Sequence, residues 1–171
     1  MLHSLGFTFS VMPSDIDESI PTQLPANEAA EYLAVKKADF LKNRLKENEI
    51  LITSDTVVIL GNQILNKPED KQEAFSMLQQ LSGNIHQVIT GVCISSKNKT
   101  IRFSELTTVT FNEMSADDIL HYIDQHHPMD KAGAYGIQDW IGMTSIKSIE
   151  GSFYNVMGLP THRVYHELKN W

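Results

Sequence analysis

The stretch ILITSDTVVIL, from Ile50 to Leu60, decides what kind of fold this chain can form. Its two apolar runs are typical of buried strands, yet Ser54 and Asp55 stand between them. The pattern predicts a strand, a break at Ser54–Asp55, and then further strand. Desolvating a carboxylate costs free energy unless it is paired, bound to a metal or open to a cleft. Asp55 is therefore either a turn residue bonded to nearby backbone amides or part of a functional cleft, and the stretch alone leaves both interpretations open.

The segments on either side of this stretch predict a strand and two helices. Residues 7–11, FTFSV, alternate enough for a short strand, and a polar, proline-bounded loop follows them. Between residues 26 and 46 the apolar side chains recur at helical spacing, which predicts a helix. In residues 66–83, Asp70 and Glu73 have the spacing of a capping box, so a second helix is expected there.

The second half of the chain predicts two long strands followed by a mixture of elements. The strands are HQVITGVCIS (residues 86–95) and IRFSELTTVTF (residues 101–111), joined by the turn-prone SKNKT. The remaining pattern predicts a short helix, a glycine-punctuated loop, a strand and a terminal helix, at residues 115–123, 129–140, 143–151 and 159–171. This order indicates an α/β fold whose long adjacent strands pair antiparallel.

Length and composition limit the possible classes of protein. At 171 residues the chain suits one domain, residues 1–171, and its formal net charge of −7 argues against a nucleic-acid partner. No apolar run approaches the ~20 residues of a membrane helix, and the first residues lack the basic start of a signal peptide. We therefore expect a cytoplasmic protein with no membrane partner. Cys93 is the only cysteine, which excludes an intrachain disulfide and a cysteine-rich zinc site.

Three lysines are candidates for binding an anion. Lys37 lies on the same helix face as Leu33 and Leu41, Lys67 lies between a strand and a capped helix, and Lys131 lies in the glycine-rich loop. Taken singly, each has an ordinary explanation: a lysine at the edge of an apolar stripe, a surface lysine, or an ion pair. Taken together, the three lysines could line one anion site.

The carboxylates are candidates for a proton acceptor and for metal ligands. Asp15, Asp17 and Glu18 stand close together in SDIDES, a spacing that suits either a hard divalent cation or a solvated acidic loop. Asp55 could accept a proton from water or bind magnesium. The histidines show no metal-ligand spacing, and neither a G-x-S-x-G motif nor a Walker-type glycine loop is present.

Several linked motifs resemble the Maf family, the septum-formation-inhibitor-like nucleoside triphosphate pyrophosphatases. They are SDTVVIL…ILNKPED…A…ML..LSG..H.V.TGV, MDKAGAYGIQ and IEGSFYNVMGLP, and the similarity runs along effectively the whole chain. The resemblance implies a mixed, twisted central sheet flanked by helices, with two lobes around a cleft as in inosine triphosphatase-like proteins. It also implies hydrolysis of a nucleoside triphosphate to the monophosphate and pyrophosphate, a divalent cation (Mg²⁺ or Mn²⁺), and often a homodimer.

The resemblance also implies roles for individual residues. Asp55 matches the family's proton acceptor, which would activate the water that attacks the α-phosphorus, and Thr56 matches a residue tied to substrate choice. Lys37, in LAVKKA, matches the lysine of the family's L-A-x-x-K-A helix, and Lys67 matches the lysine of its KP motif. Both would stabilise the leaving pyrophosphate. Gln138, after AYGI, matches the branch that acts on dTTP and UTP, and its amide can read the imide edge of the base.

Two further assignments concern the third lysine and the metal ligands. Lys131 is expected to contact substrate as the third lysine of the anion site. The metal ligands are expected to be Asp55 with Glu18 or Asp17.

One motif of the family has no counterpart in this sequence. Family members begin with a strand and the turn S-x-S-P-R-R, whereas MLHSLGF matches the segment directly after that motif. We therefore expect either an internal start or a shortened chain with weakened phosphate affinity, because paired arginines bind phosphate bidentately and lysines do not. The alternative function is a catalytically impaired nucleotide-binding or regulatory protein of the same fold, and a third interpretation is an acidic structural dimer subunit without a ligand.

Overall fold

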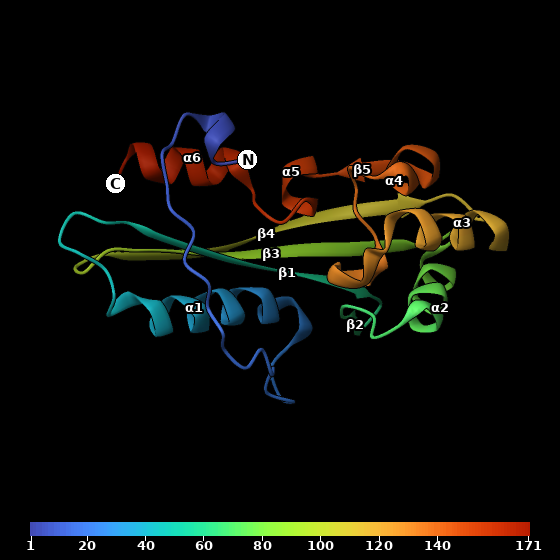
Figure 1. Cartoon of the computed structure of the whole chain (residues 1–171), viewed down its shortest axis with the longest axis horizontal. Helices are drawn as coiled ribbons and strands as arrows, with labels where there is room; N and C mark the ends of the chain where they lie inside the picture. Colours follow the sequence, from blue (N-terminus) through green and yellow to red (C-terminus); the bar gives the residue numbers. More distant parts are fainter.

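A five-stranded antiparallel sheet forms the centre of the computed structural model, which describes residues 1–171 (Figure 1). The strands follow the spatial order β2-β1-β3-β4-β5. Their bounds are β1 Leu51–Leu60, β2 Gln63–Leu65, β3 Ile85–Ser95, β4 Thr100–Phe111 and β5 Ile146–Glu150. The expected α/β fold with a central sheet flanked by helices is confirmed, and all four strand pairings in that sheet are antiparallel.

The three longest strands determine where the site lies. β3 pairs with β4 over its whole length and with β1 from Leu51↔Ser95 to Ile59↔Gln87, as the two predicted long strands require. The predicted break at Ser54–Asp55 is wrong, because β1 is continuous and Asp55 pairs with Gly91 in mid-strand. The ladder to β3 satisfies the backbone, and the carboxylate of Asp55 finds its partner on a helix instead of in a turn.

One face of the sheet is covered by α1, Ala29–Lys42 (Figure 1). Its buried residues pack on β1 and β3, for example Ala29 and Ala30 against Val57 and Ile89. Gly91 permits this close approach, since a Cβ there would collide with the backbone of Ala30 and Glu31. The helix is shorter than the predicted range of residues 26–46, because a 3₁₀ turn occupies its first residues and turns occupy its last.

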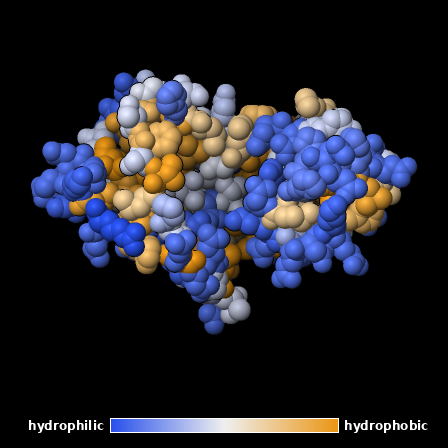
Figure 2. Space-filling model, viewed as in Figure 1, coloured by the Kyte–Doolittle hydropathy of each residue, from blue (hydrophilic) through white to orange (hydrophobic).

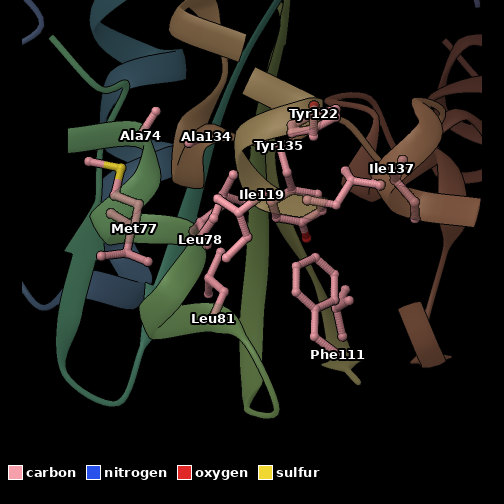
Figure 3. Packing of buried hydrophobic residues seen from close by; sticks show 14 of the residues in the cluster. Ala74, Met77, Leu78, Leu81, Phe111, Ile119, Tyr122, Ala134, Tyr135 and Ile137 are labelled. Carbon is pink, nitrogen blue, oxygen red and sulfur yellow. The ribbon is translucent and has the colours of Figure 1, made fainter. Parts of the chain in front are cut away.

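The remaining helices lie on the other face and beyond one end of the sheet (Figure 1). Their bounds are α2 Lys71–Leu81, α3 Ala116–His126, α4 Trp140–Ser145, α5 Phe153–Val156 and α6 Thr161–Lys169. The largest core cluster joins α2 and α3 to β4 and to the loop before α4. Figure 3 shows Leu78 and Leu81 of α2 beside Ile119 of α3, with Tyr135 and Phe111 to their right.

Local signals predicted several of these elements well. Asp70 caps α2 by accepting the Glu73 N–H at 2.8 Å, and Ser115 caps α3 by accepting the Asp118 N–H at 3.1 Å. The predicted strand at residues 7–11 is wrong: that segment is mostly exposed and joins no sheet, because alternation without a neighbouring strand leaves the backbone with no partner. The helices α4 and α5 were not predicted.

The molecule has two bulky ends joined by a narrower middle, and Figure 2 shows the surface hollowed between them. Loops from both faces of the sheet meet in this middle region, around the centre of β1. None of the helices is both long enough and apolar enough to cross a membrane.

Candidate active site

Asp55 lies where the outer edge of β1 becomes free. β2 pairs only with Val58–Leu60, so β1 has no neighbouring strand on that side from Leu51 to Val57. Because side chains alternate along a strand, Asp55 points to the same face as Thr53, whose hydroxyl donates to the Ala34 carbonyl of α1 at 2.7 Å. This bond fixes α1 against β1 and places the next turn of the helix beside Asp55.

Lys37 of α1 joins two carboxylates at this point. Its ammonium pairs with Asp55 and, at 2.8 Å, with Glu18 from the extended segment before α1. The side chains of Lys37 and Asp55 are only 15% and 14% exposed, whereas Glu18 is 44% exposed. The three charges therefore form a half-buried cluster that opens to solvent on the Glu18 side.

The electrostatics of this cluster keep Lys37 and Glu18 charged. Burial alone would lower the pKa of Lys37, but the hydrogen bonds to Asp55 and Glu18 outweigh it and hold that pKa above its ordinary value. The hydrogen bond to Lys37 lowers the pKa of Glu18. At neutral pH the Lys37 ammonium thus lies beside the Glu18 carboxylate.

Thr56 faces the opposite side of the sheet. Its hydroxyl bonds the Thr90 hydroxyl of β3 at 2.8 Å, and Thr90 donates to the Asn155 carbonyl at 2.8 Å. Asn155 is fully buried and donates its amide to the Val88 carbonyl and to the Thr107 hydroxyl. This polar chain fixes α5 and the residues after it, including Gly158, on the sheet next to Thr56.

Two cavities meet around the free edge of β1. The first, of about 360 Å³, lies on the Thr56 side, and the second, of about 570 Å³, lies on the side of residues 18–24. Both are lined by Asp55, Thr56, Lys67 and Ala132. A single elongated ligand can therefore pass along the strand edge from one cavity to the other.

The structure brings most of the predicted site residues together. Lys67 is exposed, lines both cavities and has no ion pair; Lys131 lines the first and pairs with Asp130 at 2.8 Å. Gln138 lines the first cavity, and its side chain makes no hydrogen bond within the protein. Glu18 lines the second cavity, and Lys37 contacts the site through Asp55.

Asp17 and Asp15 do not join the site. Asp17 bonds Ser19 and pairs with Lys36 at 3.8 Å, and Asp15 is exposed. No group of three or more histidine, cysteine, aspartate or glutamate side chains lies close enough to hold a metal without further ligands. Asp55 and Glu18 both pair with the Lys37 ammonium, and their carboxylate oxygens are of the kind that Mg²⁺ takes, one or two at a time, together with substrate phosphates.

Sequence reasoning missed the residues that form the walls of the first cavity. Val88 and Val58 form the floor on the sheet, while Tyr135 and Met157 stand on facing loops. Tyr135 and Met157 both occur in the quoted motifs, AYGIQ and NVMGLP, but nothing local shows that these two loops face each other across β1 and β3.

Comparison with known proteins finds relatives along the whole chain. The family model described as "Maf-like protein" matches residues 1–171. A protein of Parabacteroides distasonis is 45% identical over 172 residues, which cover 100% of this chain and 89% of the relative. Relatives from Flavobacterium psychrophilum (47% identity, 98% and 86% covered) and Porphyromonas gingivalis (48%, 98% and 84%) match similarly. All three are named dTTP/UTP pyrophosphatase, and with a match of this extent the chain belongs to the Maf family.

Proposed function

We propose that this protein hydrolyses dTTP and UTP to the nucleoside monophosphate and pyrophosphate. The observation that supports this function best is Asp55 at the junction of two cavities, held by Lys37 and flanked by the unpaired Lys67. The names of the relatives agree with it.

Asp55 is suited to act as the general base. Its Oδ2 receives the hydrogen bond from Lys37, and no donor of the protein contacts its Oδ1. Oδ1 can therefore accept a proton from a water molecule that attacks the α-phosphorus. The new bond joins the water oxygen to that phosphorus, and the bond to the bridging oxygen breaks as pyrophosphate leaves.

The charge balance of the site suits the binding of a divalent cation together with a triphosphate. Lys37, Lys67 and Lys131 are balanced one for one by Asp55, Glu18 and Asp130, so the three lysines and three carboxylates carry no net charge. A triphosphate needs more positive charge than Lys67 alone provides, and Asp55 and Glu18 would hold Mg²⁺ or Mn²⁺. When bound, the ion neutralises charge on the phosphate oxygens.

The first cavity suits a pyrimidine base. Val88, Tyr135 and Met157 provide apolar walls for a flat ring, and the free amide of Gln138 offers one donor group and one acceptor to its edge. The hydroxyl of Thr56 is already bonded to Thr90, so Thr56 helps to shape the wall where the two cavities meet.

One observation favours the alternative of a catalytically impaired nucleotide-binding protein. The lining of both cavities contains no arginine, although paired arginines are the strongest side-chain ligands for phosphate. Measuring pyrophosphate release from UTP, dTTP, CTP and GTP, with Mg²⁺ or Mn²⁺, separates the two functions. The proposal predicts release from UTP and dTTP; binding of these nucleotides without release would identify the impaired protein.

Gln138→Glu tests the assignment of the base. Replacing the amide by a carboxylate removes its donor group, so preference should shift away from UTP and dTTP. Unchanged selectivity in this variant would show that Gln138 does not read the base. We also propose, from the resemblance alone, a homodimer and a cytoplasmic location.

A further inference from the structure

A buried tyrosine of α3 holds the loop that carries Gln138. Tyr122 is 0% exposed; its hydroxyl donates to Asp139 Oδ2 at 2.9 Å and accepts the Gly136 N–H at 3.1 Å. These two partners stand on either side of Gln138 in the sequence. One hydroxyl thus fixes the backbone before and after the residue that lines the cavity.

Asp139 uses its carboxylate in an unusual way. It occupies the N-cap position of α4, where an aspartate commonly accepts a backbone N–H, yet it makes no such bond. Its carboxylate bonds Tyr122, and burial is the main cause that raises the pKa of the Tyr122 hydroxyl, which keeps it protonated as a donor. Asp139 thus bonds a residue of another helix at a position where it could have capped its own helix. This indicates that its carboxylate serves to hold the loop and not to start α4.

The space around Gly136 shows how tightly this loop is packed. A Cβ at this position would lie 2.5 Å from Asp139 Oδ2 and 3.0 Å from Lys131 Cε. The tethered carboxylate and the aliphatic part of Lys131 therefore both contact Gly136. The side chains of Tyr122 and Asp139 form a tether that lies between two residues of the site, Lys131 and Gln138. Neither of these two side chains lines a cavity.

We propose that Tyr122 and Asp139 are positioning residues for base selection, because they fix the backbone from Gly136 to Gln138 and thereby aim the Gln138 amide. This inference rests on the proposed function and adds to it how selectivity is maintained. A glutamine has three rotatable side-chain bonds, so it discriminates between bases only if its backbone is fixed. The phosphates react at Asp55, which is held by Lys37 of α1 and receives no hydrogen bond from this loop.

The test compares Tyr122→Phe, Asp139→Ala and Asp139→Asn with the unchanged protein. Calorimetry gives the Kd for UMP and for CMP, and pyrophosphate release gives kcat and KM for UTP. Ser115→Ala is the matched control, because it removes the cap of the same helix without touching the tether. Each variant is also checked by its urea midpoint.

We expect Tyr122→Phe and Asp139→Ala each to weaken UMP binding by up to about tenfold, the range for the neutral hydrogen bond that a misplaced Gln138 amide no longer makes to the base. The ratio of the UMP Kd to the CMP Kd should rise toward one, while kcat stays within about twofold of the unchanged protein. Asp139→Asn keeps an acceptor oxygen and should restore most of the selectivity. The double variant should be no worse than either single one, because both remove the same tether.

Other results overturn the inference. A UMP-to-CMP ratio in Tyr122→Phe that equals that of Ser115→Ala would show that the tether serves stability alone, and so would additive losses in the double variant. If the unchanged protein binds UMP but releases no pyrophosphate, the proposed reaction fails while the Kd ratios still decide the inference. If it binds neither nucleotide, both are wrong.

Discussion

Replacing Lys37 by methionine tests the charge cluster that this account places at the centre of the site. Methionine keeps the unbranched stem and removes the ammonium, so Asp55 and Glu18 face each other without a cation. Removing one partner of a fully buried pair costs about 3–5 kcal/mol, and partial exposure of this cluster reduces that to about 2–3 kcal/mol. For a domain of this size the loss corresponds to a fall in Tm of about 4–12 °C.

The destabilisation should depend on pH in a definite direction. The pKa of Glu18 is lowered by Lys37, so the stability gained from this pair is complete above the unfolded pKa and is lost as pH falls through the folded value. The pKa of Lys37 is raised, so its contribution is complete below its unfolded pKa and is lost only as pH rises through the folded value. The difference in Tm should therefore be constant near neutral pH and shrink below about pH 4.5, the ordinary value for glutamate.

Thermal unfolding of both proteins at pH values from about 3.5 to about 8 measures this difference. Lys36→Met is the control: Lys36 is the adjacent lysine of α1, its partner Asp17 is 76% exposed, and its loss should cost less than about 1 kcal/mol. Equal effects of the two substitutions, or a difference in Tm that does not shrink in acid, would refute the cluster.

Two further predictions concern residues away from the chemistry. Burial lowers the pKa of His86 to about 4, so on acidification the unfolded chain binds this proton first, and stability should fall by about 3 kcal/mol between pH 6.5 and 4. His86→Gln can still bond Tyr135 and should flatten that part of the stability-against-pH profile measured by urea titration. Parallel profiles of the two proteins would contradict the assignment. Gly91→Ala should cost about 3 kcal/mol or more by urea denaturation, because the new Cβ meets the α1 backbone. Gly61→Ala, where the space is open and only the positive φ is strained, should cost about 1 kcal/mol, and equal losses at the two positions would show that α1 does not pack this closely.

The elements with local signals could be predicted from the sequence. The caps of α2 and α3 and the strand-forming runs of β3 and β4 depend on residues within a few positions of one another. The same local reasoning failed at Asp55, because its partner Lys37 lies 18 residues away on another element and no nearby residue indicates the ion pair. A polar residue between apolar runs is typical of a turn when its partner cannot be seen.

The candidate site also contains residues that could be predicted from the sequence and residues that could not. The resemblance selected Asp55, Lys67 and Gln138, and these residues line one cavity in the structure. It could not select Tyr122 or Asp139, which act through contacts between α3 and a loop and line no cavity. Packing across the fold, which local spacing does not reveal, determines such residues.

The most direct test of the central claim is the turnover of UTP by Asp55→Asn. This substitution keeps the volume of the side chain and an oxygen for Lys37, but it removes the base at the junction of the two cavities. The account predicts that kcat for pyrophosphate release falls by about 10²-fold or more in a protein that still folds. Turnover equal to that of the unchanged protein would show that Asp55 does not activate the attacking water.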